Sequence, residues 1–390
     1  MDIKLFNMGF GESILLSSYE DNSCFLIDCG SESPSKDAYF QNVINEITSY
    51  SSKSALLTHF HEDHINGFLD ISKKDPHSFD MVYIPHIFTL DHPNFTDLEI
   101  IRYILERIQC PNDRRFTLWD LLKQLVTSRQ RIELLRRGDF FNQIESEFNV
   151  LWPIADQMMP HKITNSITKK LKISEEDWNA IYRLSDAINK MYLELYRSRG
   201  DVVFERNINS VESELRSTEE KLYILWLQQI QVNNEFRSGI EQCIQSIKRN
   251  ANKASIVFQG GDVDKRILLT GDIPSNIMDK IGRNEFSPSI RLHEKYYAVK
   301  APHHGTDTHY FNFGCYAVYD VVMVSNGETR MPKRGLVSHQ YNQLSRSYAI
   351  KCTNSCSGRC DCYKCLPRIK CSQPNDMCGI VNPQPYIVIQ

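Results

Sequence analysis

The stretch Thr58-His-Phe-His-Glu-Asp-His64 is the most informative part of this sequence. It holds four side chains of the metal-ligating type: His59, His61, Asp63 and His64. It directly follows Ser54-Ala-Leu-Leu-Thr58, a compact apolar run typical of a buried strand. Alternation sends His59 and His61 in one direction, and the turn brings Asp63 and His64 to a neighbouring point. Imidazole with carboxylate suits zinc, manganese or iron, so the stretch predicts a metal site. The alternative is a solvated turn that is rich in histidine.

Two later stretches also place polar residues directly after apolar runs. Leu268-Leu-Thr-Gly-Asp272 ends in a carboxylate, and Ala301-Pro-His303-His304-Gly305 holds two adjacent histidines. Each is weak evidence alone, because aspartate commonly ends a strand and histidine is common on surfaces. Three strands that each end in metal-type ligands nevertheless predict one site along one edge of a sheet.

Length and composition favour a globular protein of more than one unit. The chain has 390 residues, of which 41% are hydrophobic, and a formal net charge of −3. This length exceeds one ordinary core, and this charge gives no global attraction to nucleic acid or anionic membrane. The N-terminal Met1-Asp-Ile-Lys-Leu-Phe6 lacks a secretory signal, and no apolar run is long enough to span a membrane. We therefore expect a cytoplasmic protein without membrane contact, whose cysteines are thiols or metal ligands.

The pattern along the chain alternates between strands and helices. Short apolar runs predict strands near 3–6, 13–17, 24–28, 54–58, 81–85, 149–153, 255–258, 266–272, 296–300 and 320–325, with a helix over 38–50. Residues 96–147 and about 174–249 carry apolar residues at helical spacing. The second block begins with Ser174-Glu-Glu-Asp177, which resembles a capping box.

These motifs carry a resemblance to a known family. Phe25-Leu-Ile-Asp28-Cys-Gly30, the His59–His64 stretch, Leu268–Asp272 and His303-His304-Gly305 occur in the order seen in metallo-β-lactamase-fold hydrolases. The chain most resembles the hydrolase domain of ComEC-like DNA-uptake proteins, also through Asn252–Phe258 and through Ser325-Asn-Gly followed by Ser338-His339. The resemblance covers roughly residues 1–90, 148–156 and 250–345.

The resemblance implies an α/β fold of the metallo-β-lactamase type, an αββα sandwich. The helical blocks and the Cys-rich segment have no counterpart in the family, so we expect them to be helical insertions and a C-terminal zinc-binding tail. We expect six segments: the first half of the sandwich (1–95), a helical insertion (96–147), a sandwich strand (148–156), a second helical insertion (157–249), the second half of the sandwich (250–345) and the tail (346–390).

The resemblance also implies roles at the site, with two divalent ions, zinc or manganese. His59 and His61 would hold one ion, and Asp63, His64 and one histidine of the 303/304 pair, assigned as His304, the other, with Asp272 between the ions. His303 would position the substrate or protonate the leaving group, so Asp63, His303 and His304 are the expected catalytic residues. Asp28 would support the ligands, and His339 is either a substrate contact or a surface residue.

The sequence departs from this family at two points. ComEC-like domains often carry Asp where His61 stands, so this chain has the fuller motif of the wider superfamily. A further histidine that usually completes the first metal site has no clear counterpart, and His86 and His161 are the candidates.

The C-terminal segment is rich in cysteine. Its seven cysteines are Cys352, Cys356, Cys360, Cys362, Cys365, Cys371 and Cys378. Thiolates this dense in a reducing compartment predict one or two structural zinc ions, with Cys360, Cys362 and Cys365 the most compact set. A disulfide-linked or redox segment is the alternative.

The resulting hypothesis is a dinuclear metal-dependent hydrolase that acts on phosphodiesters, either a phosphodiesterase or a nuclease, through a water or hydroxide bridging two metals. The alternative is a regulated effector or interaction module that uses the zinc-stabilised tail to bind other proteins. The helical insertion 157–249 is expected to act as a lid or to bind a protein partner or a second copy. If it forms an oligomer surface, we expect Ile240 and Ile247 to lie on it. Basic stretches at Arg129–Arg131, Arg136-Arg137 and Lys248-Arg249 are more simply solvated helix faces than phosphate contacts.

Overall fold

The computed structural model describes residues 1–110, 116–154, 161–198, 205–232, 234–326, 340–343, 349–353 and 385–389. The chain divides into two compact units. The first consists of Met1–Pro85, Leu134–Pro153 and Asn252–Gln390, and the second of His86–Glu133 and Ile154–Ala251. The protein is therefore a mixed α/β protein whose first unit is assembled from three separate parts of the sequence.

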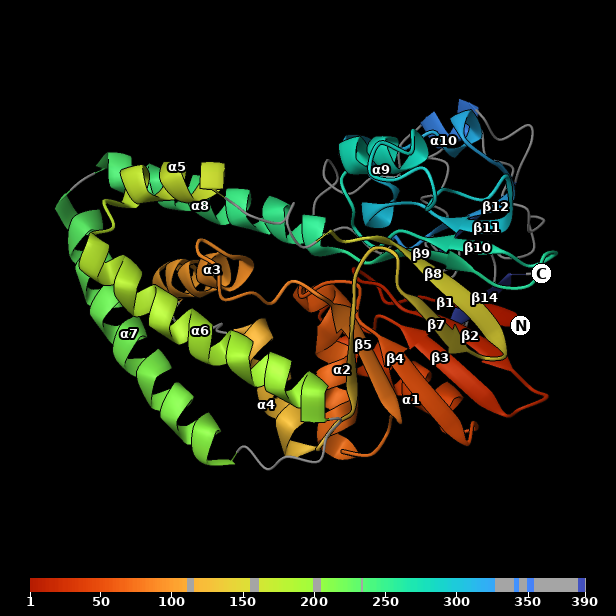
Figure 1. The fold of residues 1–390 in the computed structure, drawn as a ribbon, viewed down its shortest axis with the longest axis horizontal. Coiled ribbons are helices and arrows are strands. Elements are labelled where there is room, and N and C mark those ends of the chain that lie inside the picture. The colour runs from red at the N-terminus through yellow and green to blue at the C-terminus, as the bar shows by residue number, and fades with distance from the viewer. Residues whose placement is uncertain are drawn as a thin grey trace. The chain divides into compact units, whose positions relative to one another are not determined.

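The first unit contains two seven-stranded sheets (Figure 1). The first sheet has the order β14-β1-β2-β3-β4-β5-β6. Its strands are β1 (Asp2–Phe6), β2 (Ile14–Ser18), β3 (Ser23–Ile27), β4 (Ser52–Leu56), β5 (Met81–Pro85), β6 (Ile132–Leu135) and β14 (Tyr386–Ile389). Strands β3, β4 and β5 run parallel, because helices α1 (Lys36–Ile47) and α2 (Glu62–Lys74) connect them. Their carboxyl ends therefore lie at one edge of the sheet.

The second sheet has the order β13-β12-β11-β10-β9-β8-β7. Its strands are β7 (Phe140–Gln143), β8 (Ser146–Trp152), β9 (Val257–Gly260), β10 (Ile267–Leu269), β11 (Lys295–Lys300), β12 (Val318–Val324) and β13 (Ala349–Cys352). Strands β10 to β13 run parallel, and α9 (Ser275–Gly282) connects β10 to β11. This sheet also gathers the carboxyl ends of neighbouring strands at one edge.

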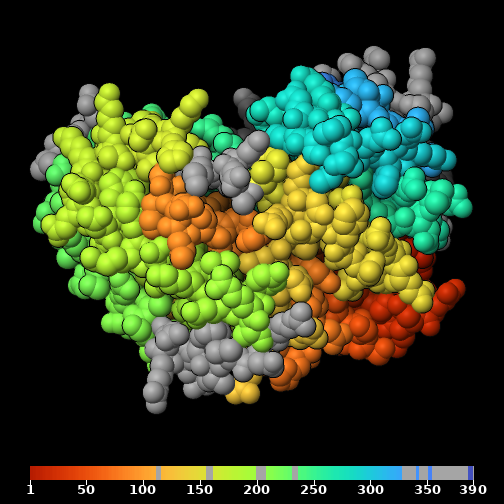
Figure 2. All heavy atoms as spheres, viewed as in Figure 1, coloured from red at the N-terminus to blue at the C-terminus, as the bar shows by residue number. Residues whose placement is uncertain are grey.

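Alternating residues of both sheets form one shared hydrophobic core. Ile14 and Leu16 of β2 contribute from the first sheet, and Phe148 and Phe258 from the second. Phe25 lies at the centre, because its ring contacts Tyr83, Phe141, Phe148 and Phe258. Burying such a side chain stabilises the fold by roughly 1.5–3 kcal/mol. In Figure 2 the segment that contains β7 and β8 (yellow) is seen between the N-terminal strands (red) and residues near 300 (cyan).

The second unit consists of helices. They are α3 (Phe95–Gln109), α4 (Thr117–Thr127), α5 (His161–Leu171), α6 (Glu175–Ser198), α7 (Glu205–Val232) and α8 (Asn234–Ala251). Ser174 accepts a hydrogen bond from the Asp177 backbone N–H (3.2 Å), so the predicted cap does begin a helix. Buried polar contacts join the helices: Thr96 donates to Asn189 (2.6 Å), and the Tyr192 hydroxyl donates to the Leu118 carbonyl (2.7 Å).

The structure corrects three expectations from the sequence. The range 96–147, predicted to be helical, contains strands β6 and β7, whose four-residue lengths are too short to show a periodic pattern. The range 346–390, predicted to be a separate tail, contains β13 and β14, which pair with β12 and β1. Ile240 and Ile247, assigned to an oligomer surface, are buried within the helical unit itself.

The first unit also contains the short helix α10 (Gln340–Gln343). In the part of the chain that the structure describes, no helix combines the length and apolarity needed to cross a bilayer.

Candidate metal centre

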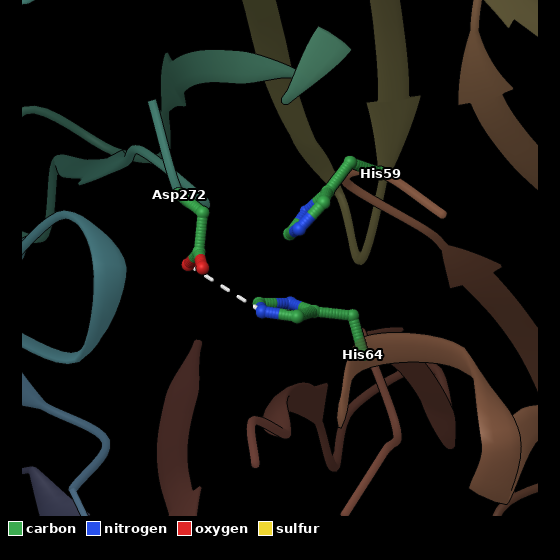
Figure 3. A group of neighbouring side chains, drawn as sticks. All are labelled: His59, His64 and Asp272. Atoms are coloured by element: carbon green, nitrogen blue, oxygen red, sulfur yellow. Dashed lines mark ion pairs between the residues drawn. The ribbon is translucent and has the colours of Figure 1, made fainter. Parts of the chain in front are cut away.

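Five of the six predicted metal ligands meet where strands of the two sheets end, whereas His61 belongs to none of the possible cation-binding groups found among the described residues. His59 follows β4, Asp63 and His64 lie in the first turn of α2, Asp272 follows β10 and His304 follows β11. Among the described residues, three groups could each hold a cation, with ligand atoms that all lie within 4.8 Å of one another. The first is His59, His64 and Asp272, the second is Asp63, His64 and His304, and the third is Glu12, Asp28 and His64. Figure 3 shows the side chains of the first group pointing toward one another, His59 and His64 from the β4–α2 segment and Asp272 from the loop after β10. All seven residues of these groups are buried.

His64 is oriented by Asp28. The Asp28 carboxylate accepts hydrogen bonds from the Thr58 backbone N–H (2.7 Å) and the Thr58 hydroxyl (2.7 Å), and its Oδ2 lies 2.8 Å from His64 Nδ1. A carboxylate only accepts, so His64 Nδ1 carries a proton. The Nε2 atom then lies 3.4 Å from Asp272 Oδ1. Among the described residues neither of these two buried atoms has a hydrogen-bond partner.

His304 repeats this arrangement on the other side. Its Nδ1 lies 2.8 Å from the Ser325 carbonyl oxygen, which can only accept, so Nδ1 carries a proton. Its Nε2 lies 3.2 Å from Asp63 Oδ2. In a neutral imidazole this contact would join two hydrogen-bond acceptors. A proton or a metal cation therefore has to lie between His304 and Asp63, as it does between His64 and Asp272.

His59 brings a third imidazole to the same place. Thr58 uses its hydroxyl proton on Asp28, so the hydroxyl oxygen accepts from His59 Nδ1 at 3.1 Å. His59 Nε2 lies 3.1 Å from His61 Nδ1. His61 is half-buried at the start of α2. Because Nδ1 donates to Thr58, Nε2 is the acceptor nitrogen of His59, and a ring fixed in this way resembles the oriented histidine ligands of metal sites.

The charges of the site favour a cation. Burial alone would lower the pKa of His64, but Asp272, Asp28 and Asp63 together hold it well above its usual range. Burial alone would raise the pKa of Asp272, but His303, His64 and His304 hold it well below its usual range. Burial and the neighbouring His64 keep the pKa of His59 low, so His59 stays neutral. The carboxylates thus favour positive charge beside them, and a nitrogen and oxygen donor set of this kind fits zinc or manganese.

His303 lies at the accessible side of the site. Its side chain is 29% exposed, and its Nδ1 lies 2.9 Å from Asp272 Oδ2. The Asn252 amide nitrogen lies 2.9 Å from the same Nδ1, and the His309 ring stacks on His303 with centroids 4.0 Å apart. Both His303 and His304 have positive φ, 46° and 56°. Such backbone strain is typical of functional loops.

Other predicted residues lie elsewhere or outside the described chain. His86 follows β5 and His161 begins α5, and neither belongs to a cation-binding group found among the described residues. Cys352 is buried in β13. The remaining residues of these predictions lie outside the described part of the chain: Cys356, Cys360, Cys362, Cys365, Cys371, Cys378 and His339.

A buried ion pair beneath the site was not predicted. Lys300 Nζ lies 2.6 Å from Glu12 Oε2, with side-chain exposures of 0% and 1%. The Glu12 backbone N–H donates to the Asp63 carbonyl (3.0 Å), while Lys300 ends the strand that leads to His303. Gly30 allows the close approach, because a Cβ there would lie 2.3 Å from backbone atoms of Asp63 and His64. The pair thus joins the segments that carry the two halves of the site. The available signal was a charged residue in Gly11-Glu12-Ser13, directly before an apolar strand.

Comparison with known proteins adds little to this geometry. No protein-family model and no curated protein matches the sequence. One solved structure similar to the chain is described as a protein of unknown function from Enterococcus faecalis V583, with 10% identity and a TM-score of 0.28. The match covers 76% of this chain and 49% of that chain, so this chain spans about half the length of that protein. A similarity this low supports no conclusion about fold or function.

Proposed function

We propose that the first unit is a metallo-β-lactamase-fold domain that acts as a dinuclear metal-dependent hydrolase of phosphodiesters. Three features support the fold: two sheets with a shared core, helices that connect parallel strands, and ligands at strand ends in the family's order. The preference for phosphodiesters, either small molecules or nucleic acid, rests on the resemblance to ComEC-like domains, because a fold alone does not fix a substrate.

The observation that carries the proposal is the pair of acceptor-to-acceptor contacts, His64 with Asp272 and His304 with Asp63. Each needs a proton or a metal cation between its two atoms, and each histidine is held by its other nitrogen in the orientation that a metal ligand requires. Asp272 lies beside both of these histidines, since Oδ1 is 3.4 Å from His64 and Oδ2 is 4.0 Å from His304. This position suits a residue shared by two ions.

Each remaining group has a role that its position suggests. Two divalent ions held here would make water acidic enough to attack at neutral pH and would stabilise negative charge on the phosphoryl oxygens. Asp28 and the Ser325 carbonyl keep the ligand imidazoles in one tautomer and one orientation. His303 is the partly exposed titratable group beside Asp272, so it is placed to give a proton to the leaving alkoxide.

The test is hydrolysis by protein reconstituted with zinc or manganese. The substrates are bis(p-nitrophenyl) phosphate, single- and double-stranded nucleic acid, a thioester and a β-lactam. We expect metal-dependent cleavage of phosphodiesters, reduced by at least about 100-fold in Asp272→Asn. His77→Gln is the matched control, because His77 is an exposed histidine outside the site. Unchanged activity in Asp272→Asn would refute the assigned site, while cleavage of only the thioester or β-lactam would refute the substrate and leave the metal site standing.

A further inference from the structure

A polar cavity in the first unit lies away from the ligands described above. Its volume is about 520 Å³, within the range of small-molecule pockets. The residues that line it include Asn149 of β8, Gln259 of β9, Arg266, Arg291, His293 and Tyr316. Arg266 directly precedes β10, whereas Asp272 follows the same strand, so the cavity and the candidate metal centre lie toward opposite ends of β10. None of the predicted metal ligands lines this cavity.

The wall that carries Arg291 and His293 is held in place by Gln259. This glutamine is 2% exposed, and its amide nitrogen donates to the Arg291 carbonyl (2.9 Å). Its amide oxygen accepts from the His293 backbone N–H (3.2 Å) and from the Tyr296 hydroxyl. Rigid walls reduce the ordering cost of binding a ligand, so the cavity is preorganised.

Arg137 fixes the segment that leads into this wall. Its guanidinium donates to the carbonyl oxygens of Leu151 (2.7 Å) and Ile290 (2.7 Å), and it lies over the Phe286 ring. The Arg137 guanidinium is therefore occupied by backbone carbonyl groups. Arg266 and Arg291 are different, because neither forms an ion pair with any described acidic residue in the chain.

The charges that line the cavity favour an anion. Two guanidinium groups face one carboxylate, that of Glu294. The positive charge of Arg266 also reaches His293, where burial and Arg266 together lower the pKa of the imidazole. An anion placed there would lie beside unpaired guanidinium groups, which bind the oxygens of a phosphate in a bidentate manner.

Two asparagines add further polar groups to the lining of the cavity. The side-chain oxygens of Asn149 and Asn284, which both line it, are buried and have no hydrogen-bond partner among the described residues. Asn149 lies beside Gln259 in the register of β8 and β9. A buried amide without a partner costs about 1–3 kcal/mol, which a ligand with hydroxyl or amino groups would recover.

From these observations we propose that this cavity binds the phosphate ester of a small organic molecule, with Arg266 and Arg291 on the phosphate and Asn149 on the organic part. This site is separate from the proposed hydrolytic centre and does not depend on it. Two arginines select for phosphate, and the volume admits a ligand of nucleotide size.

The experiment is calorimetric titration of the full chain after metal removal with a chelator, so that phosphate cannot bind to active-site metal. The probes are inorganic phosphate and adenosine 5′-monophosphate. We expect saturable binding that weakens at least about tenfold in Arg266→Gln/Arg291→Gln. Arg283→Gln is the matched control, because Arg283 is an exposed arginine of the same segment that does not line the cavity.

Two further variants separate binding from folding. Arg291→Gln alone replaces an exposed residue and should weaken binding without affecting the fold. Asn149→Ala should weaken the binding of adenosine 5′-monophosphate more than the binding of inorganic phosphate, because only adenosine 5′-monophosphate has an organic part. Absence of saturable binding up to about 10 mM, or equal affinity in wild type and the double arginine variant, would overturn the proposal.

Discussion

His64 in the first unit and His92 in the second both lie between carboxylates, but their surroundings differ. His64 is fully buried and faces Asp28 and Asp272, with His59 and His304 nearby. His92 is 19% exposed and faces Asp97 through Nδ1 (2.9 Å) and Asp186 through Nε2 (3.3 Å). The second arrangement is complete when both ring nitrogens of His92 carry a proton. The first brings three buried imidazoles together and keeps one of them, that of His59, neutral.

This comparison shows what distinguishes a structural histidine from a ligand. In the helical unit, Asp97 also accepts the Asn94 backbone N–H at the start of α3, so the His92 contact extends a helix cap. At the candidate metal centre, the second nitrogen of each histidine is fixed by a group outside the cluster. A histidine–carboxylate contact alone therefore does not indicate a metal ligand. Several oriented imidazoles that meet at one place do indicate one.

The largest loss of stability is expected when one partner of the buried Glu12–Lys300 ion pair is removed. Lys300→Met leaves Glu12 buried without its partner, which should destabilise the first unit by about 3–5 kcal/mol. The double variant Glu12→Leu/Lys300→Met removes both charges, so most of that loss should be recovered. Urea unfolding of the metal-free proteins measures both. A double variant as unstable as Lys300→Met would show that the ion pair itself, and not the unpaired charge, matters.

Removing metal should have the next largest effect, and it should act on only one of the two histidine groups. A ligand present at about 100 times its dissociation constant stabilises the folded state by about 2.7 kcal/mol, so a chelator should lower the melting temperature and increase hydrogen exchange around His64. Exchange around His92 should not change, because a proton satisfies that group. If the chelator increased exchange equally around His64 and His92, the proposed difference between the two histidines would be wrong. If it changed exchange at neither, the metal centre would be refuted.

The sequence predicted which polar residues meet at the candidate metal centre better than it predicted the contacts that hold them there. His59, Asp63, His64, Asp272 and His304 could be brought together in advance because each lies in a segment that follows a short apolar run, and local pattern reveals strand ends. Glu12 and Lys300 were missed because they are far apart in the sequence and meet only in the folded chain. The β7–β8 hairpin was missed for a related reason: its strands are short, and Phe141 and Phe148 are held by the shared core rather than by local preference.

A smaller and more local effect is expected from Ile247→Ala in the helical unit. Ile247 is 1% exposed, so the cavity left by its truncation should destabilise that unit by about 2 kcal/mol. Tryptophan fluorescence suits the measurement, because Trp119, Trp178 and Trp226 all belong to this unit. Metal content should stay at the wild-type value. A change of assembly state without a change in unfolding would instead restore Ile247 to an oligomer surface.

The smallest expected effect is the pH dependence of the His92 contact. Burial alone would lower the pKa of His92, but the hydrogen bond to Asp97 and the charges of Asp97 and Asp186 raise it above its ordinary value of 6.5. A raised folded-state pKa means that the contribution is fully present below about pH 6.5 and is lost as the pH rises through the folded-state pKa. For a partly exposed group we expect about 1 kcal/mol or less. His92→Gln should remove this part of the pH dependence from the unfolding of the helical unit, as followed by tryptophan fluorescence, and should leave metal binding unchanged. If the variant keeps the wild-type pH profile, then His92 is not protonated in the folded protein, and the contrast with His64 would have to rest on burial alone.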